Sequence, residues 1–139
     1  MDVLKIVRNV IRVGQINSVD EDNGTVDVLF VDKDNQIASN LPLPNFEYNM
    51  PRVGEQALCV FLANGLEQGF CLFTYYSDIS LPPVADKEIF RKQFDEGTYI
   101  EYNHKTRELL INADKPVKIK NDLIVEGNIV ATGTITGQV

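Results

Sequence analysis

The residues that most often carry catalysis or bind metals are few in this chain. Its 139 residues include one histidine, His104, and two cysteines, Cys59 and Cys71. A nucleophile with its base, or a zinc site, needs several such side chains close together. His104 lies in the polar stretch YNHKTR, whereas the cysteines lie in the apolar runs ALCVFL and GFCLF. The sequence therefore predicts no catalytic residue and no zinc site, and His104 is expected in an exposed turn.

The acidic run DEDNG, Asp20 to Gly24, begins like a calcium-binding loop. In such a loop a glycine holds the sixth position and a glutamate closes the loop at the twelfth. Here the glycine comes one position early and the closing glutamate is missing. The run is interpreted as a turn between strands, and we expect no metal and no cofactor.

The charge of the chain argues against several classes of partner. Twenty acidic and 13 basic residues give a net charge of -7, the wrong sign for binding phosphates or anionic lipids. Exposed aromatic residues of a small barrel can stack on single-stranded nucleic acid, but those around Tyr75 have acidic neighbours. No nucleic acid is expected as a partner. The N-terminus has no signal-peptide pattern, so we expect the chain to be made in a cytoplasm.

Short strands separated by polar turns make up the first part of the chain. Before them, residues 1–12 space apolar side chains three and four apart, which predicts a short amphipathic helix. About five strands are then predicted over residues 13–82. Five short antiparallel strands suffice for a small closed barrel, and an OB-fold is the natural candidate.

The two cysteine-containing runs favour a hairpin that turns around Asn64 and Gly65. Cys59 and Cys71 would then be buried neighbours, able to oxidise in vitro but without a function. The Pro82-Pro83 pair and the charged residues after it indicate a linker over residues 83–95.

The C-terminal region, residues 96–139, returns to β character and ends in an unusually long alternating segment. From Val117 to Val139 the odd positions are almost all apolar or small, and the even positions are polar except Ile124 and Val130. A straight strand of this length would reach about 75 Å, whereas a compact chain of this size is about 40 Å across. Its large apolar side chains cannot offset the entropy lost in ordering so much backbone.

Other chains must therefore supply contacts and hydrogen bonds, and a trimeric, intertwined β-helix meets this need best. Asn121 is the one polar member of the inward row and would pair with its copies or hold a water or ion on the axis. Glycines would permit close approach at the corners. The predicted axial residues are Val117, Ile119, Asn121, Leu123, Val125, Ile129, Ile135 and Val139, and the predicted corner glycines are Gly127, Gly133 and Gly137. Ordinary strands completing a second small domain are the alternative.

Three stretches resemble the phage baseplate assembly protein V family, the central spikes of contractile tails and related injection machines. They are RVGQINSVDEDNGTVDVLFVD, VGEQALCVFLANGLEQGFCLFTYYSD and EGTYIEYNHKTRELLI. The GEQ, LEQG and YSD series before the proline pair is the most specific part. The resemblance covers nearly the whole chain.

The resemblance implies an all-β protein with a short N-terminal α-helix, an OB-fold barrel over residues 13–82 and a trimeric β-helix spike over residues 96–139. It further implies a non-enzymatic homotrimer in the virion tail baseplate, assembled in the host cytoplasm. The barrel would bind tail hub proteins, and sheath contraction would drive the spike through the host envelope.

One departure from the family concerns the tip. Several members end in a His-x-His motif that binds iron, whereas this chain ends in TITGQV. We therefore expect no metal ligand, and either Val139 closes the tip or a separate protein caps it. Two other functions stay open: a spike of a phage-tail-like bacteriocin or toxin-delivery system, and an OB-fold binding module with an oligomerisation tail.

Overall fold

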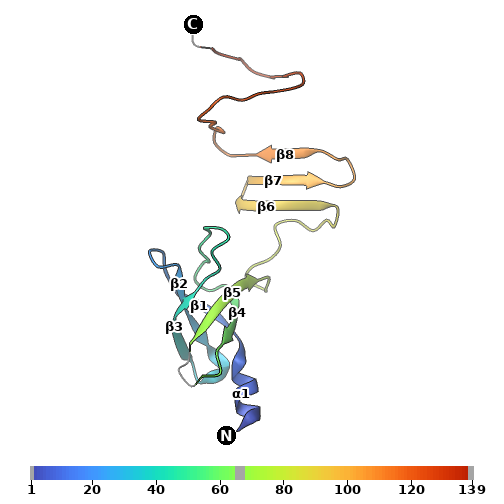
Figure 1. Cartoon of the computed structure of the whole chain (residues 1–139). Helices are drawn as coiled ribbons and strands as arrows, with labels where there is room; N and C mark the ends of the chain where they lie inside the picture. The colour runs from blue at the N-terminus through green and yellow to red at the C-terminus, as the bar shows by residue number, and fades with distance from the viewer. Residues whose placement is uncertain (1, 65–67, 138–139) are drawn as a thin grey trace. The chain divides into compact units, whose positions relative to one another are not determined.

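The chain folds into two compact units, unit 1 (Met1–Pro83) and unit 2 (Val84–Val139). The structure is a computed structural model that describes residues 2–64 and 68–137. Over these residues the chain is mostly β, with one short α-helix and two antiparallel sheets (Figure 1). The all-β prediction is therefore confirmed.

Unit 1 begins with α1 (Val3–Val10), which is shorter than the predicted helix over residues 1–12. The Asp2 side chain caps it by accepting a hydrogen bond from the backbone N–H of Lys5 at 3.3 Å. The helix ends where Ile11 adopts an extended backbone and enters the first strand. The spacing of the apolar residues Val10, Ile11 and Val13 fits both a helix and a strand. From Ile11 onward the chain is a strand, because it pairs with β4.

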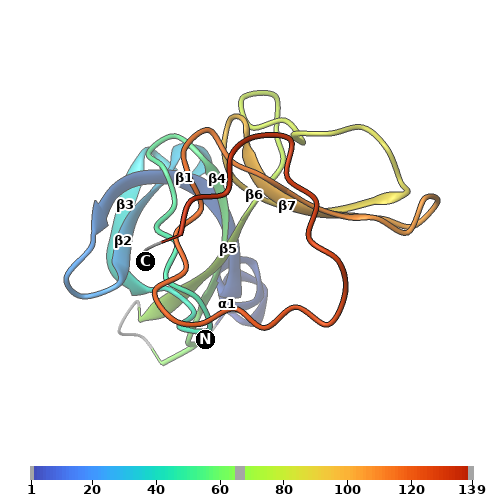
Figure 2. The same ribbon diagram turned by 90° about the horizontal axis from the view of Figure 1, so that it is seen from above.

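Five strands form the sheet of unit 1, as the sequence predicts. Their order is β3-β2-β1-β4-β5. The two outer strands also approach each other, so the sheet curls strongly (Figure 2). The strands are β1 (Ile11–Asp20), β2 (Thr25–Phe30), β3 (Gln36–Pro42), β4 (Gln56–Phe61) and β5 (Gly69–Tyr75), and the short 3-10 helix η1 (Val31–Lys33) follows β2.

The core of unit 1 comes mainly from alternating residues of β2 and β4, with single or paired contributions from the other strands. In β2, Val26, Val28 and Phe30 are buried and the residues between them are half-buried. The ring of Phe30 meets the edge of Phe61 with 5.9 Å between centroids. The buried residues are Ile16, Val26, Val28, Phe30, Leu41, Ala57, Cys59, Phe61 and Cys71.

Unit 2 contains a three-stranded antiparallel sheet in the order β6-β7-β8. These strands are β6 (Ile89–Asp95), β7 (Thr98–Asn103) and β8 (Leu109–Asn112). The Asn103 side chain accepts hydrogen bonds from the N–H groups of Lys105 and Thr106, which forms the predicted turn after β7. Beyond β8, no helix or strand occurs among the described residues of 113–137.

The predicted linker over residues 83–95 is wrong for its second half. Residues 89–95 form β6, which pairs along its length with β7. Consecutive charged residues, Arg91 and Lys92, hid the alternation of this strand. The Arg91 side chain forms an ion pair with Glu101 and is only 15% exposed, unlike a residue of a solvated linker.

Candidate functional site

The tail, defined here as residues 115–137, contains most of the predicted axial residues. In the single chain they are all exposed, from 43% for Val125 to 73% for Ile135. Ile124 and Val130, the two apolar residues at even positions, are more exposed still, at 87% and 90%. Val139 lies outside the described residues. The large apolar side chains of the odd row are thus left uncovered by the single chain.

The backbone of the tail is unpaired within the single chain. Among the described residues, no backbone hydrogen bond joins 115–137 to another backbone group. The Asn121 side chain accepts from the N–H of its neighbour Asp122 at 2.7 Å, so it is engaged locally. The segment bends at 120–121, 126–127 and 132–133, and the backbone donors and acceptors between these bends are left to pair with groups of other chains.

No contact within the single chain requires glycine at the three predicted corner positions. A Cβ placed on Gly127, Gly133 or Gly137 would meet no atom within 4 Å. None of the three is among the glycines with positive φ. Their role at corners stays a prediction about an assembly.

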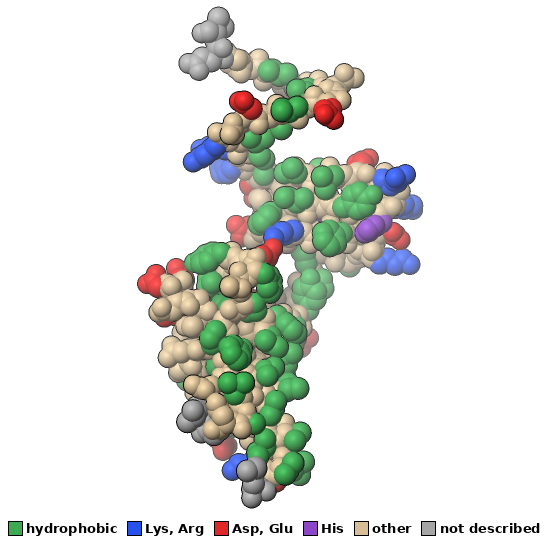
Figure 3. All heavy atoms as spheres, viewed as in Figure 1, with side chains coloured by type: hydrophobic (Ala, Val, Ile, Leu, Met, Phe, Trp, Pro, Cys, Tyr) green, Lys and Arg blue, Asp and Glu red, His purple; other side chains and the backbone are tan. Residues whose placement is uncertain are grey.

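The sheet of unit 2 has one apolar face that the sequence analysis did not single out. The pairing register places Phe90, Tyr102 and Leu109 opposite one another, and likewise Lys92, Ile100 and Ile111. Phe90 and Leu109 are 70% and 69% exposed. Figure 3 shows hydrophobic side chains gathered over this sheet. We call this the apolar face, and in the sequence the adjacent charges of Arg91 and Lys92 obscure the alternation that would have indicated it.

On the opposite face of the same sheet, the polar side chains bind one another. The Arg91 Nε donates to Glu101 at 2.9 Å, and the guanidinium stacks on the Tyr99 ring at 3.8 Å. Another guanidinium N–H donates to Gln93 at 3.2 Å. Because these polar groups satisfy one another, only the apolar face is left to be covered.

The cysteines behave as the hairpin prediction requires. Cys59 and Cys71 are direct partners across β4 and β5, both buried and both free thiols. A hydrogen bond with the Cys71 thiol, together with burial, raises the pKa of Cys59. A thiol that stays protonated and buried is a poor nucleophile. The predicted turn between the strands extends into residues 65–67, which lie outside the described part of the chain.

His104 follows β7 at an exposed position, as predicted, with its ring 5.1 Å from that of Tyr102. Across residues 2–64 and 68–137, no three histidine, cysteine or acidic side chains gather closely enough to hold a metal ion. In the same residues, no helix has the length and apolar character needed to cross a membrane.

A comparison with protein-family models and with curated proteins finds no match to this sequence. The resemblance to the baseplate spikes therefore depends on the residues quoted above.

Proposed function

We propose that this chain is the non-enzymatic central spike of a contractile-tail baseplate and that it acts as a homotrimer. In this proposal, unit 1 is an OB-fold barrel that attaches the spike to the tail hub. The tails of three chains intertwine into a β-helix that crosses the host envelope when the sheath contracts.

The observation that carries the proposal is the tail itself. Residues 115–137 form no helix or strand, bend at 120–121, 126–127 and 132–133, and have no backbone partner among the described residues, and their sequence alternates between apolar or small and polar side chains. Three copies around an axis would bury the apolar row and pair the backbone at once. A narrow shaft of paired strands needs no globular core of its own, which suits a part that must pierce.

The distribution of buried residues supports the same conclusion. All of the described buried residues belong to unit 1, and none belongs to unit 2. A sheet whose apolar face stays in water gains little hydrophobic stabilisation, and no described residue of unit 2 is buried. The apolar face and the tail therefore both need partners, and copies of the same chain supply them.

The first experiment is the solution mass by light scattering. A trimer would weigh three times 15.6 kDa, about 47 kDa. Ile129→Asp should reduce this to the monomer mass, because it would place three carboxylates on the apolar axis. Val130→Asp is the matched control, since Val130 lies on the polar side and is 90% exposed.

A monomeric wild-type chain would contradict the proposal and favour an OB-fold binding module instead. A trimer that survives Ile129→Asp would place the interface elsewhere. The spike of a bacteriocin or toxin-delivery particle would give the same masses as a phage spike.

A further inference from the structure

Unit 1 concentrates its positive charge at one place. Residues 1–83 contain five lysines and arginines but eleven acidic residues. Four of the five basic residues line a single cleft of about 610 Å³, between α1 and the segment η1 to β3. We call it the basic cleft, and it is lined by Asp2, Lys5, Arg8, Asn9, Arg12, Asp32, Lys33, Asp34 and Gln36.

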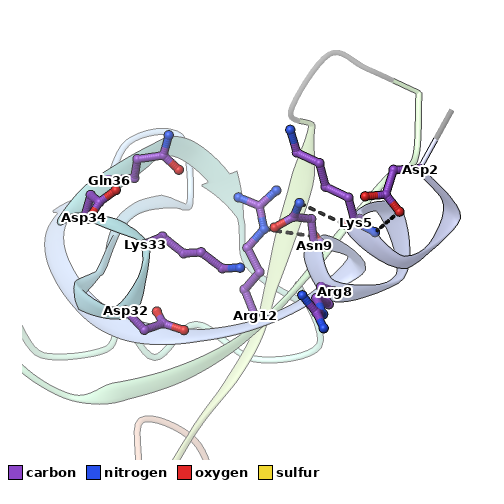
Figure 4. A pocket seen from close by; sticks show the side chains of 9 residues that line it. All are labelled: Asp2, Lys5, Arg8, Asn9, Arg12, Asp32, Lys33, Asp34 and Gln36. Carbon is purple, nitrogen blue, oxygen red and sulfur yellow. Dashed lines mark hydrogen bonds between the residues drawn. The ribbon is translucent and has the colours of Figure 1, made fainter.

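Two cations point toward each other across the basic cleft (Figure 4). Arg12 comes from β1 and Lys33 from η1, and both are half-buried. The Arg12 Nε donates to the Asn9 carbonyl at 2.9 Å, and its guanidinium stacks on the Phe61 ring at 4.0 Å. These contacts fix the guanidinium while its terminal N–H groups still face the cleft.

No carboxylate neutralises these charges at close range. Within the described residues, the ion pair of the chain is Arg91–Glu101, which lies in unit 2. Asp2 is occupied with capping α1, and Asp34 lies beside Gln36, away from Arg12 (Figure 4). Asp32 also lines the cleft, on the side of Lys33, but forms no ion pair with it. Like charges that converge in a half-buried cleft repel each other, and an anion between them would turn that repulsion into attraction.

The basic cleft lies at a defined end of unit 1. Ile11 precedes the cleft residue Arg12 at the start of β1. It pairs with Val60 near the end of β4, and Val60 pairs with Phe70 near the start of β5. The chain leaves β5 at Tyr75, which aligns with Gln56 at the other end. The cleft is therefore at the end of the barrel opposite the one from which the chain continues toward Pro83.

An apolar stripe borders the same end. On α1, Val3, Leu4 and Val7 are between 56% and 68% exposed, whereas Ile6 and Val10 turn toward the sheet. A partner surface that fits here carries carboxylates for the cleft and apolar side chains for the helix.

We propose that the basic cleft docks an acidic segment of another protein, whose carboxylates bind between Arg12 and Lys33. The identification of that protein as the one on which the spike is mounted rests on the proposed function. A long polyanion such as DNA does not fit, because the eleven acidic residues of unit 1 would repel it. The acidic turn of another copy does not fit either, since Asp20 to Asp22 follow the opposite end of β1.

The test uses the full chain and a fluorescently labelled hexaglutamate peptide, with binding followed by anisotropy at low salt. The Kd should rise about tenfold in the double variant Arg8→Glu/Lys33→Glu and rise further with salt. Arg52→Glu is the control, because Arg52 is the exposed fifth basic residue of unit 1 and lies outside the cleft. It should change the Kd less than about twofold.

Three outcomes would overturn the proposal: no binding by the wild-type chain, an equal effect of Arg52→Glu, or full displacement of the peptide by equimolar inorganic phosphate. The mass of the double variant separates this proposal from the trimer. An unchanged mass with weakened peptide binding supports the docking site, whereas dissociation into monomers would make the cleft a contact between copies. A monomeric wild-type chain that still binds the peptide at the cleft would contradict the proposed trimeric spike but not the docking site.

Discussion

At Gly14, β1 passes so close to its neighbours that a side chain has no room. A Cβ there would lie 2.6 Å from the Leu29 carbonyl oxygen and 2.7 Å from a methyl group of Val28. The backbone oxygen cannot move without breaking the pairing of β1 with β2. This close approach is what lets the sheet curl tightly around its small core.

Gly14→Ala should therefore destabilise unit 1 by about 1 to 3 kcal/mol, the usual cost of forcing extra atoms into a packed core. Chemical denaturation followed by circular dichroism would measure the loss. Ser39→Ala, on the exposed side of β3, is the control and should change stability by less than about 0.5 kcal/mol. An alanine at position 14 that leaves stability unchanged would mean that β1 can move away from β2.

A second prediction at the scale of residues concerns Asp20. Hydrogen bonds from the Asn23 side chain and backbone hold the pKa of Asp20 below its ordinary value of 3.8. Because the folded state has the lower pKa, the carboxylate stabilises the turn above pH 3.8, and this contribution is lost as the pH falls through the folded value.

Asp20→Ala should accordingly lower the unfolding temperature at neutral pH, and the difference from the wild type should shrink as the solution is acidified below pH 3.8. Thermal melts over a pH series would show this. Asp22→Ala, in the same turn, is the control. A difference that stays constant with pH would show that the charge of Asp20 does not contribute.

At the scale of elements, the sheet of unit 2 offers a test of its two faces. Leu109→Asp would put a charge on the apolar face, and we expect it to weaken the proposed trimer, because in that proposal copies of the chain cover this face. Leu110→Asp, on the opposite face of the same strand, should leave assembly intact. Sedimentation over a range of concentrations would compare them, and equal effects would show that the apolar face is not an interface.

Sequence patterns predicted the elements that follow a single periodicity. In unit 1, apolar runs alternate with polar turn residues, and this pattern predicts its strands and turns. The structure confirms the five strands, the turn at DEDNG and the hairpin that contains the two cysteines. β6 was missed because adjacent Arg91 and Lys92 looked like a solvated linker. The pairing with Glu101 that makes Arg91 an inward residue depends on another strand, ten residues away.

The basic cleft could not be predicted from sequence for a similar reason. Arg8 and Arg12 are four residues apart in the sequence, on α1 and at the start of β1, but Lys33 comes from η1, between β2 and β3. Only the curl of the sheet brings η1 beside α1. The alternation of the tail, in contrast, is visible in the sequence because it needs no other element to be recognised, and the position of its apolar residues on a trimer axis stays a prediction.

At the scale of the whole molecule, the two units should respond differently to concentration. Unit 1 holds all of the described buried residues, so it should unfold at a temperature independent of concentration. In the proposed trimer, unit 2 would gain its core by association, and mass action raises the unfolding temperature of such a unit as concentration rises. Calorimetry at several concentrations should resolve one fixed and one shifting transition. Two fixed transitions would contradict the trimer.

The unpaired backbone of the tail also determines how the chain meets proteases. A protease holds its substrate as an extended strand, through hydrogen bonds to the backbone on both sides of the cleaved bond. A lone chain offers residues 115–137 with an unpaired backbone and no helix or strand, and Lys118 and Lys120 are sites for trypsin. In the proposed trimer the same backbone groups would be occupied. If the proposal holds, chains that fail to assemble would be degraded from the tail in a cell, and assembled trimers would survive.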